Sequence, residues 1–236
     1  MTRSIADQTT AELGGERSVL VRQRRDHAEL EQLIERYHAA DDSTRDDLLQ
    51  HAWRLVFPHA FAEEAVLWPA LRASVEGGEE LTARVEREHQ RINELVAELD
   101  TTTPTAPGYH ERLETAFALL RTDAREEEDD LLARLREVTD DAELVRLGRR
   151  WEAVRRTAPT RPHPVVSRRP PGNALAALPL SLLDRARDVM DRSGRARSGR
   201  VARGAMAASR GMGGMARRIE HLPPLRRGER TDTRRT

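Results

Sequence analysis

The sequence contains no cysteine and no lysine, and only 3% of its residues are aromatic. Without cysteine, the chain offers no thiolate ligand and forms no disulfide, which excludes thiolate zinc sites and iron–sulfur clusters. No run of residues approaches the roughly 20 apolar residues of a membrane span. The first 18 residues also lack the apolar core of a signal peptide. We therefore expect a cytoplasmic protein.

The 236 residues have a formal net charge of zero, but the charge is divided unevenly along the chain. Residues 1–157 contain 22 arginines and 34 acidic residues, a net charge of −12. Residues 158–236 contain 18 arginines and 6 acidic residues, a net charge of +12. Such a split indicates two parts with different physical properties.

The acidic part shows the periodicity of helices. Apolar residues recur at three- and four-residue steps, and glycine and proline fall mainly between the periodic segments. The predicted helices cover residues 16–40, 45–74, 79–100 and 109–137, and a shorter one ends near 156. Four long helices with short connections favour an all-α, up-down-up-down four-helix bundle over residues 16–157. We expect residues 1–15 to be a flexible N-terminus.

The basic part has a different character. Residues 158–172 contain five prolines and cannot continue a helix. A short amphipathic helix can follow at 174–192, and the rest is rich in glycine, alanine and arginine with few bulky apolar residues. Because this composition buries too little apolar surface to offset the entropy of ordering, we expect a largely disordered C-terminal tail.

Two other interpretations of the basic part stay open. It can be an arginine-rich arm that binds nucleic acid or an anionic membrane surface. It can also fold back on the acidic bundle, because the two parts carry opposite net charges of equal size. No aromatic residues are interleaved with the arginines, so sequence-specific RNA binding is not expected.

The acidic part contains an internal repeat. RRDHAELEQLIERY at 24–37 matches EREHQRINELVAEL at 86–99, which aligns His27 with His89. HAFAEEAVLWPAL at 59–71 matches DAREEEDDLLARL at 123–135. The second match aligns Glu63 with Glu127 and sets Asp123 where the first half has His59. Each half therefore consists of a helix with one inward histidine, followed by a second helix. The second helix carries a potential metal ligand, His59 or Asp123, four residues before a glutamate.

This spacing has a chemical meaning. Residues four apart lie on one helix face, about one turn apart, so each such pair can bind the same ion. Imidazole nitrogen combined with carboxylate oxygen suits iron, manganese or zinc. Any one of these residues alone reads more simply as a core histidine or a solvated acid, and the repeat-related combination is what indicates a metal site. Six groups from four helices can hold two bridged metals: His27, His59, Glu63, His89, Asp123 and Glu127. Glu64 and Glu128 are candidates for carboxylates that orient the imidazoles.

The segments DHAEL, HAFAEEAVLWPAL, EHQRI and EEEDDLL resemble the hemerythrin-like (HHE cation-binding) domain over roughly residues 17–150. The resemblance implies a four-helix bundle with a non-haem di-iron centre, whose ligands are typically five histidines and two bridging carboxylates. The positions that match are His27, His59, Glu63, His89 and Glu127. Where the family usually has a histidine before the last glutamate, this chain has Asp123.

Asp123 changes the expected chemistry. Aspartate can ligate a hard cation through oxygen, so a six-ligand site is retained that is more anionic and favours Fe(III) or manganese over soft metals. Extra negative charge stabilises the oxidised state, and we expect reversible oxygen carriage to suffer. The alternative is that the second metal position is weakened or lost, and only one ion binds.

The resemblance and the ligand set together predict a non-haem iron protein that binds or senses oxygen, peroxide or nitric oxide, or handles iron. Two iron ions are expected, with manganese or zinc as alternatives. No general acid or base is visible outside the ligand set, so we expect binding or sensing rather than turnover. Two other classes stay open: a di-iron enzyme with peroxidase- or catalase-like activity, and a metal-free helical interaction module whose basic tail binds nucleic acid.

Overall fold

The computed structural model describes residues 3–195, 198–231 and 233, and these contain helices but no strand. The acidic part forms α1 (Val19–Ala39), α2 (Asp42–Ala62), α3 (Trp68–Ser74), α4 (Gly78–Thr101), α5 (Tyr109–Glu126), α6 (Leu132–Val138) and α7 (Asp141–Thr157). The basic part forms α8 (Gly172–Arg195) and α9 (Gly199–Glu220). Two short 3-10 helices are η1 (Ile5–Asp7) and η4 (Pro223–Arg226). The predicted all-α class is confirmed.

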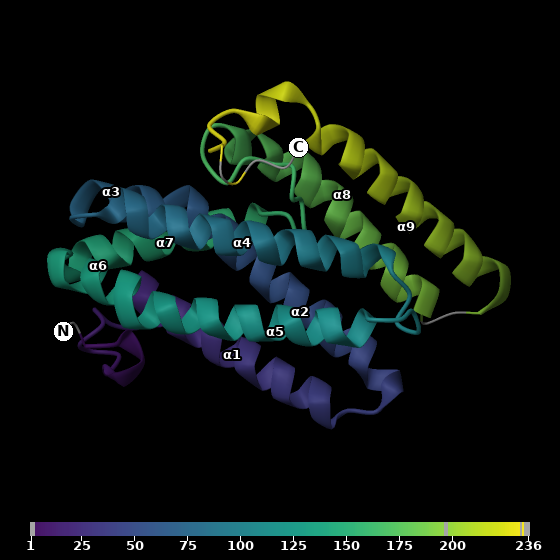
Figure 1. Cartoon of the computed structure of the whole chain (residues 1–236), viewed down its shortest axis with the longest axis horizontal. Helices are drawn as coiled ribbons and strands as arrows, with labels where there is room; N and C mark the ends of the chain where they lie inside the picture. The colour runs from purple at the N-terminus through teal and green to yellow at the C-terminus, as the bar shows by residue number, and fades with distance from the viewer. Residues whose placement is uncertain (1–2, 196–197, 232, 234–236) are drawn as a thin grey trace.

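Two of the four rods of the bundle contain a π-helical turn. The turn η2 (Glu63–Leu67) joins α2 to α3, and η3 (Glu127–Leu131) joins α5 to α6. Each of these rods is therefore continuous, and with α1 and α4 they form the predicted bundle (Figure 1). The fifth long helix of this part, α7, packs against α1, α2 and η2.

Short polar side chains fix where three of these helices begin. The Ser18 hydroxyl accepts a hydrogen bond from the backbone N–H of Leu20 at 3.2 Å before α1. A carboxylate oxygen of Asp41 accepts from the Thr44 N–H at 3.1 Å before α2, and Asp140 caps α7 in the same way. These caps satisfy backbone donors that have no partner inside the helix.

Gly148 sets the position of α7. A β-carbon at this position would lie against the Arg17 carbonyl oxygen and 3.0 Å from the Val19 nitrogen. The backbone of α7 therefore touches the start of α1, which a larger residue would prevent. This close approach brings Trp151, fully buried, against the inside of the bundle.

The apolar core of the bundle is divided into two clusters. One cluster gathers around Trp68, Leu131 and Trp151 and includes Ile5 and Leu13 from the N-terminal segment that we expected to be flexible. The other gathers around Ile34, Phe57 and Phe117 at the opposite end of the rods. Along each rod, the histidines and carboxylates of the repeat lie between the residues of the two clusters. A polar layer thus separates two apolar layers.

The prediction of a largely disordered C-terminal tail is wrong. The helix expected at 174–192 lies within α8, and α9 folds back along it to form a hairpin beside the bundle (Figure 1). Small residues of α9, including Gly213 and Ala216, are buried against the rest of the molecule. A small apolar cluster that includes Leu180 and Leu225 completes the packing of this part, which composition alone did not reveal.

Charge complementarity holds the hairpin on the bundle, as the fold-back interpretation expects. Arg54 Nε lies 2.8 Å from an Asp188 oxygen, and Arg187 Nη2 lies 3.1 Å from an Asp100 oxygen. Arg161 lies between the two parts and contacts Asp100, Asp188 and Asp191 at 2.5–3.2 Å. Arg161 and Arg187 of the basic part thus pair with Asp100 of the acidic part, while Arg54–Asp188 joins the two parts in the opposite sense.

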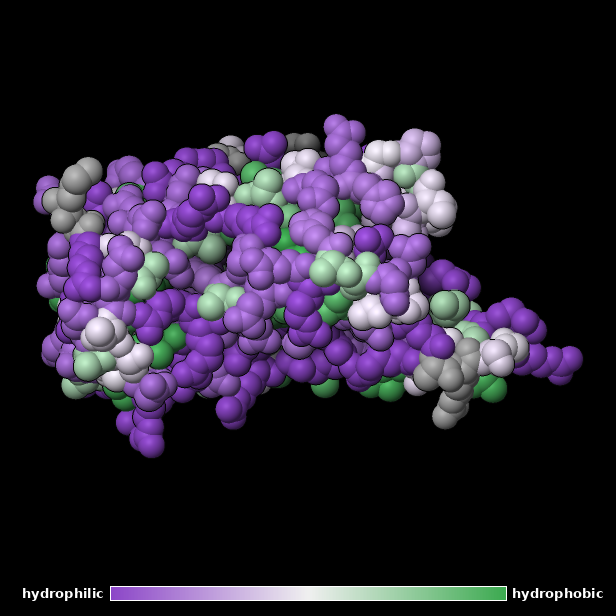
Figure 2. All heavy atoms as spheres, turned by 90° about the horizontal axis from the view of Figure 1, so that it is seen from below, coloured by the Kyte–Doolittle hydropathy of each residue, from purple (hydrophilic) through white to green (hydrophobic). Residues whose placement is uncertain are grey.

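The face opposite the hairpin is mainly hydrophilic, with hydrophobic residues in small scattered groups (Figure 2). This pattern is expected for helices whose apolar stripes face a core. Among the described residues, no helix combines the length and the apolar character needed to cross a bilayer.

Candidate metal centre

The six predicted residues meet in the polar layer at the middle of the bundle. His27 comes from α1, His59 from α2 and His89 from α4, while Asp123 comes from α5. Glu63 and Glu127 are the first residues of the two π-helical turns. Glu63 is fully buried and Glu127 is 1% exposed. Four rods thus deliver imidazoles and carboxylates to one buried place.

Four of these side chains form a first group whose ligand atoms all lie within 4.8 Å of one another: His27, His59, Glu63 and Glu127. The two imidazoles face each other, with 3.3 Å between their Nε2 atoms. His59 Nε2 lies 3.0 Å from Glu63 Oε1, and His27 Nε2 lies 3.3 Å from Glu127 Oε2. Two nitrogens and two oxygens therefore point at one position.

A second group lies beside the first and consists of His89, Asp123 and Glu127. His89 Nε2 lies 3.4 Å from Asp123 Oδ2 and 3.6 Å from Glu127 Oε1. Glu63 reaches this group as well, since its Oε2 lies 3.7 Å from His89 Nε2. Glu127 and Glu63 each direct one oxygen to either group, which is the arrangement of carboxylates that bridge two cations.

The π-helical turns explain how both glutamates reach the centre. A π-turn contains one extra residue and commonly occurs at functional sites, where it redirects a side chain. In the first half of the repeat Pro69 follows the turn, but the corresponding residue in the second half is Ala133. The same turn forms in both halves, so proline is not required for it. The widened turn coincides with the ligand position rather than with a helix breaker.

Each imidazole is held from behind by a carboxylate. The Nδ1 atoms of His27 and His89 lie 2.9 Å from Glu128 Oε1 and 3.0 Å from Glu64 Oε1, as predicted for these two glutamates. His59 Nδ1 lies 3.1 Å from Asp26 Oδ2. A carboxylate that accepts the Nδ1–H fixes the tautomer and leaves Nε2 facing the centre, as is usual for metal-binding histidine.

The electrostatics of the cluster favour positive charge. Burial alone lowers the pKa of His27 and His59, but neighbouring carboxylates outweigh it and raise the pKa values to about 9 and about 10. The pKa of His89 is also raised well above its usual value, chiefly by Asp123. Burial and the nearby Glu127 charge raise the pKa of Glu63 to about 7. The layer therefore gathers protons in the absence of other cations.

Several buried oxygens in this layer accept no hydrogen bond of good geometry from the described residues. They include both carboxylate oxygens of Glu63, Oε2 of Glu64, Oε1 of Glu127 and Oδ1 of Asp123. Buried polar atoms are nearly always hydrogen-bonded, so these exceptions need a cause. Cations would satisfy the oxygens, and the mixed nitrogen and oxygen donors suit iron, manganese or zinc. The residues present therefore fit a pair of such ions.

A small cavity of about 30 Å³ adjoins the cluster. It is lined by His27, His59, His89 and Asp123 on one side, and by apolar residues such as Leu55 and Ile92 on the other. A single water needs at least about 10–15 Å³ of such space. The cavity therefore accommodates a water or a ligand of two heavy atoms.

Four residues near the centre were not predicted from the sequence. Asp26 stands next to His27 in the DHAEL segment but holds His59, a contact between helices that the segment alone does not reveal. The ring of Trp151 lies 5.4 Å from that of His59, and Arg155 lies over the Trp151 ring. Arg168 Nη1 lies 3.6 Å from Glu64 Oε1. The last three come from regions outside the repeat, which carried no signal for them.

Comparison with known proteins agrees with this site. Residues 19–135 match the family model described as the hemerythrin HHE cation binding domain. The chain is also similar to an uncharacterised hemerythrin-like protein of Schizosaccharomyces pombe, with 23% identity over 171 residues that cover 71% of this chain and 84% of that protein. No solved structure matches. The matched segment contains every residue of the two groups described above, and the chain therefore belongs, through residues 19–135, to the hemerythrin HHE cation-binding domain family.

Proposed function

We propose that the protein binds two iron ions side by side in the polar layer of the bundle. The observation that supports this most directly is the sharing of Glu127 between the two ligand groups. His27, His59, Glu63 and Glu127 would hold one ion, while His89, Asp123 and the other oxygens of the two glutamates would hold the second. Manganese or zinc can occupy the same donors.

The surroundings of the centre support a role in binding or sensing a small molecule. Iron would supply affinity for oxygen, peroxide or nitric oxide and a change of oxidation state. The chain contributes a cavity of about 30 Å³ with many apolar residues in its lining, which suits a ligand of two heavy atoms. A cavity of this size suits such a ligand, which supports sensing or buffering of a small molecule at the centre.

Metal analysis of protein from iron-supplied cells tests the proposal. We expect about two irons per chain, with charge-transfer absorption that changes when the protein is reduced or exposed to nitric oxide. Protein that folds equally well without metal and takes up no Fe(II), Mn(II) or Zn(II) would rule the proposal out. One ion per chain would contradict the paired arrangement. Sustained consumption of peroxide would replace the sensing role with an enzymatic one.

A further inference from the structure

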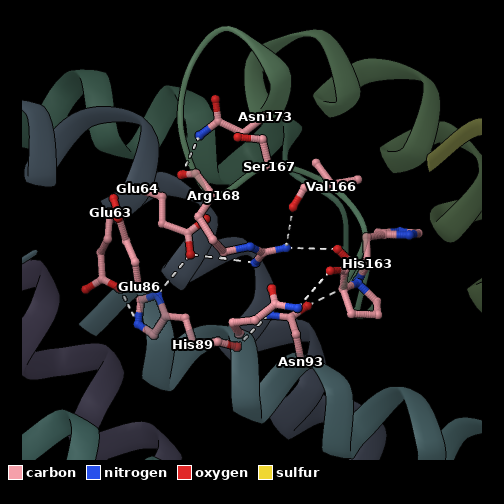
Figure 3. A network of polar contacts seen from close by, with 12 residues as sticks. Glu63, Glu64, Glu86, His89, Asn93, His163, Val166, Ser167, Arg168 and Asn173 are labelled. Carbon is pink, nitrogen blue, oxygen red and sulfur yellow. Dashed lines mark hydrogen bonds and ion pairs between the residues drawn. The ribbon is translucent and has the colours of Figure 1, made fainter. Parts of the chain in front are cut away.

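The segment between α7 and α8, residues 158–171, lies beyond Glu64 and Asn93 as seen from His89 (Figure 3). Within it, Arg168 is only 7% exposed. Its Nη1 lies 3.6 Å from Glu64 Oε1, and the same oxygen lies 3.0 Å from His89 Nδ1. A line of contacts therefore runs from the C-terminal part through Glu64 to an imidazole of the candidate centre.

The guanidinium of Arg168 is fixed by its own segment. Its Nη2 donates hydrogen bonds to the carbonyl oxygens of His163 at 2.8 Å and Val166 at 3.2 Å. The Asn173 side chain in turn donates to the Arg168 carbonyl oxygen at 3.2 Å. The segment is thus folded around the arginine (Figure 3). Such pre-positioning lowers the entropy cost of holding a long side chain in one place.

The same segment also holds the helix turn that carries His89. The Asn93 side chain donates to the His89 carbonyl oxygen at 3.1 Å. Its Oδ1 accepts a hydrogen bond from the His163 backbone N–H, also at 3.1 Å. Side chain and backbone of His89 are therefore each linked to residues 163–168 by one intermediate residue, Glu64 or Asn93.

The Glu64 carboxylate needs such a partner because it is 1% exposed. A buried charge is costly unless other groups compensate it, and the imidazole supplies only one contact. His59 shows the same arrangement, since Arg155 Nη1 lies 3.6 Å from the Asp26 oxygen that holds it. Both arginines lie beyond residue 135, where the match to the family ends.

We propose that Arg168 is a positioning residue for the metal centre, which acts through Glu64 to hold His89 toward the second ion. The inference rests on the proposed function. It assigns the C-terminal part a role in the centre. Residues 158–173 supply contacts behind Glu64 and His89 that the segment matched by the family model does not itself contain.

A double-mutant cycle tests this role with Mn(II) as the probe. The variants Arg168→Met, Glu64→Gln and their combination are compared with the wild type for the affinity of each of the two ions. Replacing outer partners of metal-binding residues typically costs 10–100-fold in metal affinity. We expect Arg168→Met to lower the affinity for one of the two ions about 10-fold. The combined variant should be no weaker than Glu64→Gln alone, since residues that act through one another are not additive.

Arg161→Met is the matched control. Arg161 attaches the same segment and α8 to the bundle through ion pairs with Asp100 and Asp188 rather than with Glu64. We expect it to lower the melting temperature and leave both Mn(II) affinities unchanged. Arg168→Lys keeps the positive charge should the methionine variant fail to fold, and its affinity loss should be smaller than that of Glu64→Gln.

The outcomes separate this inference from the proposed function. A wild type that binds no Mn(II) or iron would defeat the proposed function itself. If the wild type binds two ions but the effects of Arg168→Met and Glu64→Gln on affinity are additive, only the role of Arg168 is overturned. The same conclusion would follow if Arg161→Met lowered the Mn(II) affinities as much as Arg168→Met. Docking of the segment on the bundle would then be sufficient to explain the loss of affinity. A selective, non-additive loss would support the role.

Discussion

Nε2 of His89 lies 3.4 Å from Oδ2 of Asp123, so the residue that departs from the family pattern faces the candidate centre. Asp123 Oδ1 is buried and accepts no hydrogen bond from the described residues. The carboxylate is therefore placed as a ligand would be. Its negative charge adds to those of Glu63 and Glu127, which makes this side of the centre suited to a hard, highly charged cation.

Replacing this carboxylate by the family's usual residue tests its contribution. In Asp123→His, a neutral imidazole replaces a negative charge, so the reduced state of bound iron gains relative to the oxidised state. We expect the reduction potential to rise by roughly 60 mV or more, a tenfold change in equilibrium for one electron. Potentiometric titration followed by absorption measures this. With an unchanged potential and spectrum, position 123 would not face the metal.

Because Glu127 belongs to both ligand groups, its removal should cost more bound metal than the removal of one imidazole. Glu127→Ala removes an oxygen from both ligand groups, whereas His27→Ala removes a nitrogen from the first group alone. We expect Glu127→Ala to lose both ions and His27→Ala to keep the second, as measured by metal content after dialysis. Retention of two ions by Glu127→Ala would show that the carboxylate does not bridge them.

The contact of His163 with the C-terminal hairpin predicts a pH dependence of stability. Burial lowers the pKa of His163, but Asp184 and Glu220 outweigh it and raise the pKa to about 9. Their oxygens lie 3.0 and 3.4 Å from the ring nitrogens. Because the folded pKa exceeds the unfolded value of about 6.5, the charged histidine stabilises the fold fully below pH 6.5. This contribution is lost as the pH rises through about 9.

The comparison of the wild type with His163→Gln isolates this contribution. Between pH 6.5 and 9, the free energy of unfolding of the wild type should fall by on the order of 3 kcal/mol more than that of His163→Gln. Chemical denaturation at matched metal content measures both curves. Parallel curves would mean that His163 does not carry a proton in the folded protein.

Two glycines inside helices should respond in opposite directions to the same substitution. Gly148→Ala would drive a β-carbon into the backbone at the start of α1 and should destabilise the protein by about 2 kcal/mol. Gly204 in α9 has nothing within 4 Å of the added carbon, so Gly204→Ala should stabilise by up to about 1 kcal/mol. Thermal unfolding measures both. No gain at Gly204 would contradict a stable α9.

The repeat made most of the bundle and the six candidate ligands predictable. His27 and His89 align, as do Glu63 and Glu127, and helical periodicity then brings them to one side of each rod. Periodicity did not predict the π-helical turns, because the apolar spacing on either side of the extra residue is that of an ordinary helix. It also could not find Asp26 as the partner of His59, since a contact between helices depends on their relative rotation.

The order of the C-terminal part escaped prediction for a different reason. Composition measures the apolar area a segment can bury, but α8 and α9 are also held by ion pairs such as Arg54 with Asp188 and by a small apolar cluster around Leu180. Arg168 is one of 18 arginines in this part, and nothing in the sequence distinguishes it from the others. Its role follows only from where the folded segment places it.

The π-helical turns at Glu63 and Glu127 each contain one residue more than a regular α-helix needs. Deleting one residue such as Ala65 would let the Trp68 N–H, which now bonds the Glu63 carbonyl oxygen five residues back, make the same bond at the ordinary four-residue spacing. Trp68 and Leu71, both fully buried, would then keep their places in the core. The extra residue and the metal ligand thus lie at the same position, so a one-residue deletion there would cost the direction of the glutamate rather than the packing beyond it.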